Sequence, residues 1–197
     1  MTHRDTPGHG FYRLPSSLME LIPEEFRKNE YEEDLEWAIP VVALKDKCDF
    51  TGYLKSLHDN NNTFFKTVDD ITSHACSTMR DYMPDEYKTL TGEQVSADNS
   101  YTIQEREWIA DHVGQYLGFS AVSSSKHPGL VEVWVALCIG IDRGRYPKFD
   151  KTTEVQILVP DKEYASRGNT NWVLGSPERL GLYKKLLIEL DLPPVTR

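Results

Sequence analysis

A chain of 197 residues has room for one hydrophobic core, and two full domains would be cramped. Its 39% hydrophobic residues argue against a wholly disordered chain, and its longest apolar run is far too short to span a membrane. The formal net charge of −9 disfavours nucleic acid as a partner, because binding to a phosphate backbone depends on Lys and Arg side chains.

The cysteine and N-terminal patterns bear on the cell compartment. Cys48, Cys76 and Cys138 are too far apart for a disulfide framework or a close metal-binding pair. We therefore expect buried thiols, no structural metal and no cofactor. The first residues lack the apolar stretch of a secretory signal, which predicts a cytoplasmic protein.

The first half of the chain predicts strands and one clear helix. Residues 10–14 predict a short strand, and Ser16 is placed to cap a short helix. The apolar run 36–44 predicts a second strand, in which Pro40 favours an edge or a bulge. Apolar residues at spacings of three and four predict an amphipathic helix over 64–82.

The second half predicts one helix, a hairpin, a further strand and a last helix. Thr102 and Glu105 match a capping box for a helix that ends near Gly118. Residues 119–123 and 131–141 predict a β-hairpin, residues 152–159 a third strand, and Ser176 and Pro177 begin the last helix. The fold class predicted is α+β, as a single domain over 1–197 with a mostly antiparallel sheet and about three helices. The residues expected in the core are Val68, Ile71, Val133, Val135, Leu137 and Leu187.

Four short segments carry a resemblance. They are TPGHG at 6–10, YEEDLEWA at 31–38, DYMPDEY at 81–87 and VPDKEY at 159–164. Together they resemble an uncharacterised family of small bacterial, plasmid and phage proteins with TPxHG and YEEDxxWA segments. The resemblance implies an origin on a mobile element and no particular activity.

The first candidate site combines His9 with Glu32, Glu33 and Asp34. A histidine near carboxylates can bind a metal or act in acid–base chemistry, although at most two neighbouring carboxylates of an extended segment point to the same side. The alternative is that His9 packs or caps a turn and that the acidic run is a solvated face. Trp37 is interpreted either as the apolar anchor of a binding surface over 30–37 or as a core residue.

The second candidate site is the basic tip that contains Arg143 and Arg145. Guanidinium groups can hold a phosphate, with His9 or His127 nearby, although a basic hairpin tip can also be simply solvated. No nucleophile elbow and no phosphate-binding glycine loop is present.

Two functional hypotheses follow, and an enzyme is the less favoured class. The first is a non-catalytic acidic binding protein of phage or plasmid origin that engages a host protein in counter-defence. The alternative is an enzyme or sequestering protein for a small phosphorylated or nucleotide ligand.

Overall fold

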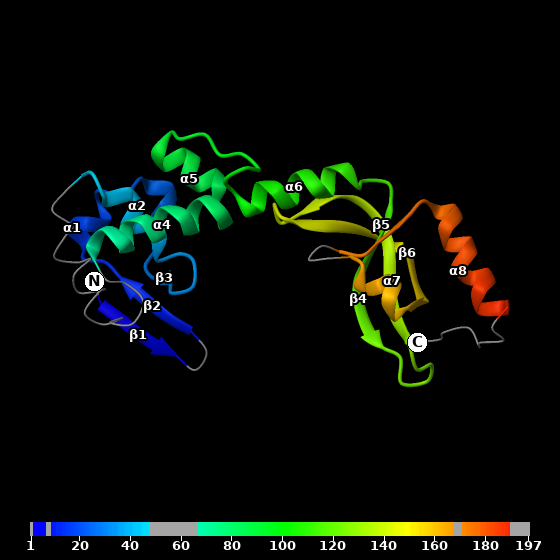
Figure 1. Ribbon diagram of the computed structural model, residues 1–197. Helices are drawn as coiled ribbons and strands as arrows, with labels where there is room; N and C mark the ends of the chain where they lie inside the picture. Colours follow the sequence, from blue (N-terminus) through cyan, green and yellow to red (C-terminus); the bar gives the residue numbers. More distant parts are fainter. Residues whose placement is uncertain (1, 7–8, 48–66, 168–170, 190–197) are drawn as a thin grey trace. The chain divides into compact units, whose positions relative to one another are not determined.

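The computed structural model describes residues 2–6, 9–47, 67–167 and 171–189, with only the backbone described for 2–6, 9, 68 and 184–189. The chain forms two compact units, Met1–Gln104 and Glu105–Arg197 (Figure 1). Antiparallel sheets with helices are present in both, so the predicted α+β class is confirmed. The expectation of one domain stays a prediction.

The first unit contains a three-stranded antiparallel sheet of β1 (Thr2–Thr6), β2 (His9–Arg13) and β3 (Tyr31–Glu32). β2 is the strand predicted over 10–14, and it pairs with β3 through Phe11 opposite Glu32. Between them lie a short helix, α1 (Ser16–Met19), and a single 3₁₀ turn, η1 (Glu24–Phe26). The side chains of Leu18 and Phe26 are buried in the core of the unit and so anchor these two turns.

The strand predicted over 36–44 is wrong, because Ala38–Leu44 forms the helix α2. All seven residues are buried, so the segment shows none of the polar positions that would reveal a helical period. Its β-branched residues favour a strand when judged alone. Pro40 is the third helical residue, where a backbone N–H would have no acceptor within the helix, so the proline costs α2 no hydrogen bond.

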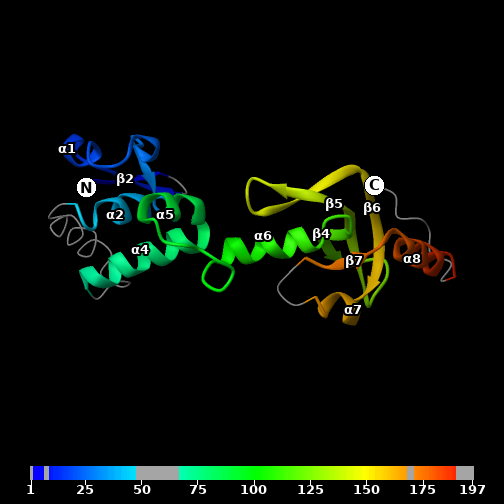
Figure 2. The same cartoon turned by 90° about the horizontal axis from the view of Figure 1, so that it is seen from above.

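The amphipathic helix predicted over 64–82 is α4 (Val68–Tyr82) within the described residues. Thr67 caps it by accepting from the Asp70 amide at 3.1 Å, while the Asp70 carboxylate accepts from the Thr67 amide at 2.9 Å. Ile71, Ala75 and Met79 form its buried stripe, as the spacing predicts. The helix packs against α2, as Figure 2 also shows.

A further helix, α5 (Pro84–Thr91), follows α4 without a prediction for it. Pro84 ends the preceding helix and also occupies the first position of this one, where proline is tolerated. Gly92 ends α5 with φ +74° in the left-handed region. A loop then continues to Ser100.

The helix predicted from Thr102 to Gly118 is α6 (Tyr101–Asp111), and the boundary between the units lies inside it. The Ser100 hydroxyl, rather than that of Thr102, accepts from the backbone of the first turn, at 3.4 Å from the Ile103 amide. Gly114 adopts φ +86°, a conformation that no helix continues through. The predicted end near Gly118 is therefore wrong: the helix ends at Asp111, Val113 is exposed, and Tyr116 begins a strand.

The second unit contains a four-stranded antiparallel sheet in the order β6-β5-β4-β7. Its strands are β4 (Tyr116–Ser123), β5 (Leu130–Asp142), β6 (Tyr146–Pro160) and β7 (Val173–Gly175). The predicted hairpin is confirmed as β4 and β5, and the third predicted strand as part of the longer β6.

One face of this sheet forms the core of the second unit. Val131, Val133 and Val135 alternate along β5, and they pack with Trp172 and with Tyr183 of α8 (Pro177–Glu189). Figure 2 shows α8 beside β6, and the short helix α7 (Asp161–Ala165) follows that strand.

The predicted core is confirmed at three of the four positions whose side chains the structure describes. Ile71, Val133 and Val135 are fully buried, and Leu137 is half-buried. The side chains of Val68 and Leu187 lie outside the described residues. The described residues form seven α-helices, four of them with eight or more residues, against about three predicted. None of these helices is long and apolar enough to cross a membrane.

Candidate functional site

The acidic segment Glu30–Trp37 joins β3 to α2 through a tight turn over residues 33–37. The turn begins where the Glu33 amide donates to the Gly10 carbonyl of β2 at 3.0 Å. It ends where the Trp37 amide donates to the Glu32 carbonyl at 2.9 Å. Both ends of the turn are therefore fixed to the first unit by backbone hydrogen bonds.

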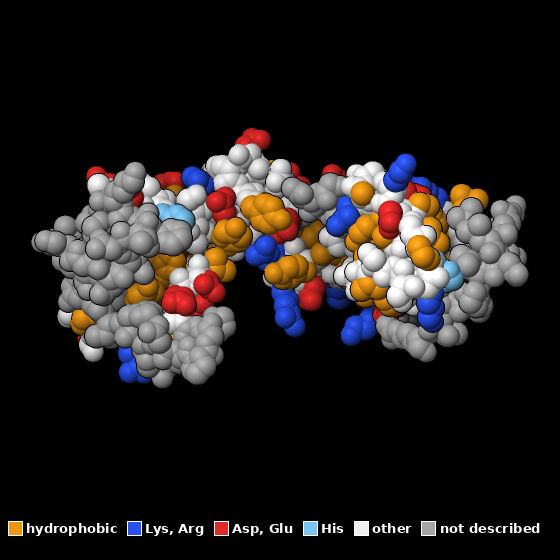
Figure 3. All heavy atoms as spheres, turned by 60° about the horizontal axis from the view of Figure 1, so that its bottom comes forward, with side chains coloured by type: hydrophobic (Ala, Val, Ile, Leu, Met, Phe, Trp, Pro, Cys, Tyr) orange, Lys and Arg blue, Asp and Glu red, His pale blue; other side chains and the backbone are white. Residues whose placement is uncertain are grey.

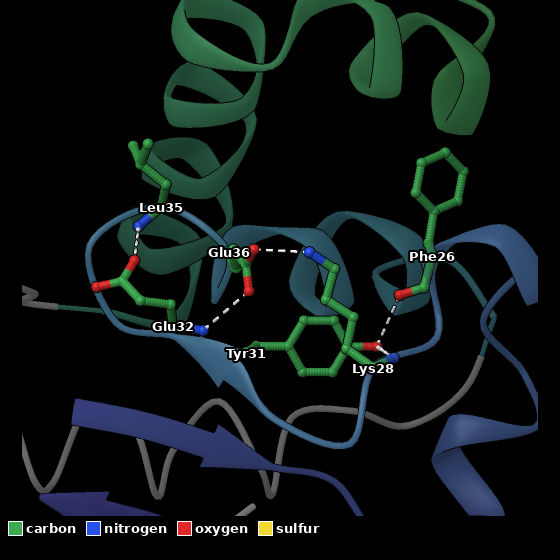
Figure 4. A network of polar contacts seen from close by, with 6 residues as sticks. All are labelled: Phe26, Lys28, Tyr31, Glu32, Leu35 and Glu36. Atoms are coloured by element: carbon green, nitrogen blue, oxygen red, sulfur yellow. Dashed lines mark hydrogen bonds and ion pairs between the residues drawn. The ribbon is translucent and has the colours of Figure 1, made fainter. Parts of the chain in front are cut away.

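Two glutamates of this segment hold the turn itself (Figure 4). The Glu32 carboxylate accepts from the Leu35 amide at 3.2 Å. The Glu36 carboxylate accepts from the Glu32 amide at 3.3 Å and pairs with the Lys28 ammonium at 2.6 Å. Glu32 and Glu36 therefore act as structural residues of the loop, which we call the acidic loop (residues 32–36).

Tyr31 fixes the strand that precedes the acidic loop. Its side chain is fully buried, and its hydroxyl donates to the Phe26 carbonyl at 3.0 Å. The same oxygen lies 3.4 Å from the Lys28 amide, which donates to it. Burial raises the pKa of the Tyr31 phenol, so the neutral form is the one built into the unit.

Trp37 belongs to the core, which decides between its two predicted placements. Its side chain is only 8% exposed and packs within the main cluster of the first unit. The indole stacks on the His74 ring of α4, with centroids 5.8 Å apart and planes 20° from parallel. The interpretation of Trp37 as an exposed anchor is therefore wrong.

Glu33 and Asp34 occupy the outer part of the acidic loop. Glu33 is half-buried and Asp34 is exposed. The three predicted carboxylates therefore have different roles. Glu32 holds the turn, while Glu33 and Asp34 lie at the surface. The His9 side chain lies outside the described residues, so its predicted place beside these carboxylates stays a prediction.

The basic tip lies between β5 and β6 in the second unit. Arg143 has a side chain that is 85% exposed, whereas Arg145 is 24% exposed and pairs with Glu105 at 3.3 Å. His127 precedes the start of β5 and the arginines follow its end, so the 13 residues of β5 separate them. The structure therefore does not bring His127 together with the arginines.

The remaining chemical candidates do not form a metal site among the described residues. No group of three His, Cys, Asp or Glu side chains there is arranged to hold a metal ion. Cys138 is a buried free thiol and Cys76 a half-buried one, while Cys48 lies outside the description.

An exposed aromatic pair lies in the first unit, where the sequence predicts none. Tyr82 ends α4, Tyr101 begins α6, and their ring centroids lie 6.4 Å apart. Both rings are exposed, although the spacing along α4 assigns Tyr82 to its buried stripe. The sequence does hold one signal for this exposure: Pro84 ends the helical periodicity two residues after Tyr82, so Tyr82 lies at the end of the buried stripe.

The fold defines an α+β protein of two units, with an acidic loop in the first and a basic hairpin tip in the second. Residues 1–113 match the family described as Domain of unknown function (DUF7007), and the chain belongs to this family. The match covers the whole first unit and α6, whereas the sheet of the second unit lies beyond it. Comparisons with curated proteins and with solved structures gave no match.

Proposed function

We propose that this protein is a non-catalytic binding protein whose acidic loop engages a basic surface of a partner protein. The observation that carries the proposal is the fixed geometry of the loop. Glu32 and Glu36 hold the turn from within, and Glu33 and Asp34 lie at its surface. A loop that is already ordered loses little conformational entropy on binding, which favours recognition by this segment.

The distribution of charge supports an acidic binding surface in the first unit. Residues 1–104 hold 19 of the 31 acidic residues and 10 of the 22 basic ones. Residues 105–197 hold 12 of each, so the whole net charge of −9 belongs to the first unit. A field of one sign steers association with a basic partner and makes that association salt-dependent.

We further propose that the partner is a host protein, and that this chain is a phage or plasmid product that acts in the host cytoplasm in counter-defence. The support for this origin is the resemblance of residues 6–10 and 31–38 to small mobile-element proteins. The matched family supplies no activity of its own.

The alternative, a site for a small phosphorylated ligand, has less support. Glu105 already pairs with Arg145, and His127 lies at the other end of β5. The two exposed cations of the tip, Arg143 and Lys148, are five residues apart on the hairpin, whereas specific phosphate sites usually combine several convergent donors in a concave pocket.

The proposal is tested by affinity capture from a bacterial lysate with quantitative mass spectrometry. The baits are the full wild-type chain, the loop variant Glu33→Lys/Asp34→Lys, and the control Glu24→Lys/Glu25→Lys. The control changes the net charge equally, at exposed positions of the same unit. We expect wild type and control to enrich the same partner and the loop variant to lose it.

Circular dichroism of each bait first establishes that all three are folded. If the loop variant is folded and enriches the same proteins as wild type, the acidic loop is not the binding surface. If wild type enriches no protein over an empty support, the proposed class of function is wrong for that host.

A further inference from the structure

The tip of the β5–β6 hairpin has an unusual backbone. Arg143 adopts φ +48°, and it is the one non-glycine residue with positive φ in the described part of the chain. Gly144 follows with φ +74°, and the Arg145 amide closes the turn on the Asp142 carbonyl at 3.2 Å. Two successive left-handed residues are typical of the tight turns that match the twist of a hairpin. An arginine in the first of these positions is disfavoured relative to Asn, Asp or Gly.

Side chains of α6 hold this tip in place. The Arg106 guanidinium donates to the Gly144 carbonyl, and Glu105 pairs with Arg145. The Arg145 guanidinium also lies over the Tyr146 ring, 5.1 Å from its centroid. Arg145 and Arg106 therefore position the turn, and Arg143 extends from it with an 85% exposed side chain.

Exposed apolar side chains lie on both faces of the ribbon that ends in this turn, since Ile141 pairs with Pro147 and Tyr146 with Asp142. β4 pairs with β5 only as far as Leu137, so β5 and β6 continue beyond it as a two-stranded ribbon. Tyr146, 52% exposed, and the exposed Ile139 and Ile141 lie on this ribbon together with Lys148. Figure 3 shows basic and hydrophobic side chains next to one another at this end of the hairpin. Arg and Tyr beside apolar residues are the composition of protein interface hot spots.

The charges of the chain indicate what such a surface fits. The ribbon tip and the part of α6 that holds it carry Arg106, Arg143, Arg145 and Lys148 against Glu105 and Asp142. A complementary partner is acidic, and the first unit of this same protein has an excess of nine acidic residues. At physiological salt, charges separated by more than about 8 Å are largely screened, so we expect this local complementarity to outweigh the repulsion between two negative molecules.

We propose that the β5–β6 tip of one molecule docks on the acidic loop of a second copy, so that the chain associates head to tail. The inference rests on the proposed function, because the same loop receives both the host partner and the tip. Such a contact joins two different surfaces and leaves one of each unused at the ends, so it builds open chains unless the rotation closes a ring.

The test is sedimentation equilibrium of the full chain over a range of concentrations, at 0.1 M and 0.5 M NaCl. We expect reversible association at the lower salt, weakened at least tenfold at the higher salt. The tip variant Arg143→Glu/Lys148→Glu and the loop variant Glu33→Lys/Asp34→Lys are both expected to be monomeric. The control Lys126→Glu/Lys162→Glu, at exposed positions of the second unit, is expected to associate like wild type.

Mixing the two monomeric variants gives the sharpest result. Each lacks one of the two surfaces, so an equimolar mixture is expected to form a dimer and nothing larger. A mixture that stays monomeric, or a wild type that stays monomeric at every concentration, overturns the inference.

Two further measurements distinguish self-association from binding of the host partner and from binding of nucleic acid. The tip variant is expected to capture the host partner as wild type does, so loss of self-association and loss of partner binding are distinguishable. Fluorescence anisotropy with a labelled DNA duplex tests the other class of anionic partner. Salt-dependent DNA binding that requires Arg143 and Lys148, in a chain that does not self-associate, assigns the tip to nucleic acid and overturns the proposal.

Discussion

Replacement of Trp37 tests whether this residue belongs to the core of the first unit. A tryptophan that is 8% exposed buries about 230 Å² of the roughly 250 Å² that such a side chain can cover. At about 25 cal/mol per Å², and with a discount for burial in the unfolded chain, Trp37→Ala is expected to lower the free energy of unfolding by about 3–5 kcal/mol. Trp37→Phe keeps an aromatic ring against His74 and is expected to cost about half as much.

The assay is urea unfolding followed by circular dichroism, which does not depend on the fluorescence of the removed indole. Leu21→Ala, at an exposed apolar position of the same unit, is the matched control and is expected to change stability by less than about 1 kcal/mol. If Trp37→Ala costs no more than Leu21→Ala, Trp37 is not a core residue, and the assignment of the acidic loop to a fixed framework is refuted.

Three further predictions concern the framework of the two units. Val135→Ala is expected to lower the free energy of unfolding by about 1–3 kcal/mol through lost burial and a residual cavity, measured by urea unfolding; a change near zero contradicts the place of Val135 in the second core. Glu32→Ala is expected to cost about 1–2 kcal/mol and to speed amide exchange at Leu35, because that amide loses its acceptor; unchanged exchange at Leu35 argues against the hydrogen bond. Burial raises the pKa of Tyr31 and, with the hydrogen bond to Glu93, that of Tyr87. Because the pKa of each phenol is higher in the folded protein than its value near 10 in the unfolded chain, the free energy of unfolding is unaffected below about pH 10 and falls above it. Alkaline unfolding is therefore expected above about pH 10, and its midpoint is expected at a higher pH in Tyr31→Phe than in wild type. Identical midpoints exclude Tyr31 as a contributor.

The sheet of the second unit was predictable because its signals are local. The run over 131–141 is apolar and rich in β-branched residues, and the turn residues 124–129 stand just before it. A hairpin needs no information from the rest of the chain, so β4 and β5 follow from sequence alone.

The helices of the first unit were harder, because tertiary burial decided them. Residues 38–44 are buried on every side, so no periodicity marks α2 as a helix, and Ile39, Val41 and Val42 favour a strand by propensity. The short helix α5 begins at Pro84, the same proline that ends α4. In the sequence, this proline marks the end of a helix more clearly than the start of another.

The sequence predicts where the acidic candidate site lies in the chain, but not what each of its carboxylates does. The sequence indicates an acidic run at residues 32–34, but nothing in it reveals that Glu32 accepts from the Leu35 backbone or that Glu36 pairs with Lys28. Those roles depend on the path of the turn, which β2 and α2 set from either end. The same limit applies to Arg145, whose partner Glu105 is 40 residues away in the chain.

Isothermal titration calorimetry with the captured partner, at 0.1 M and 0.5 M NaCl, measures whether the acidic loop is the binding surface. We expect wild type and Glu24→Lys/Glu25→Lys to bind with similar affinity and both to weaken as salt rises, and we expect Glu33→Lys/Asp34→Lys to bind at least tenfold more weakly at the lower salt. Equal affinity of a folded Glu33→Lys/Asp34→Lys variant at both salt concentrations would contradict this expectation.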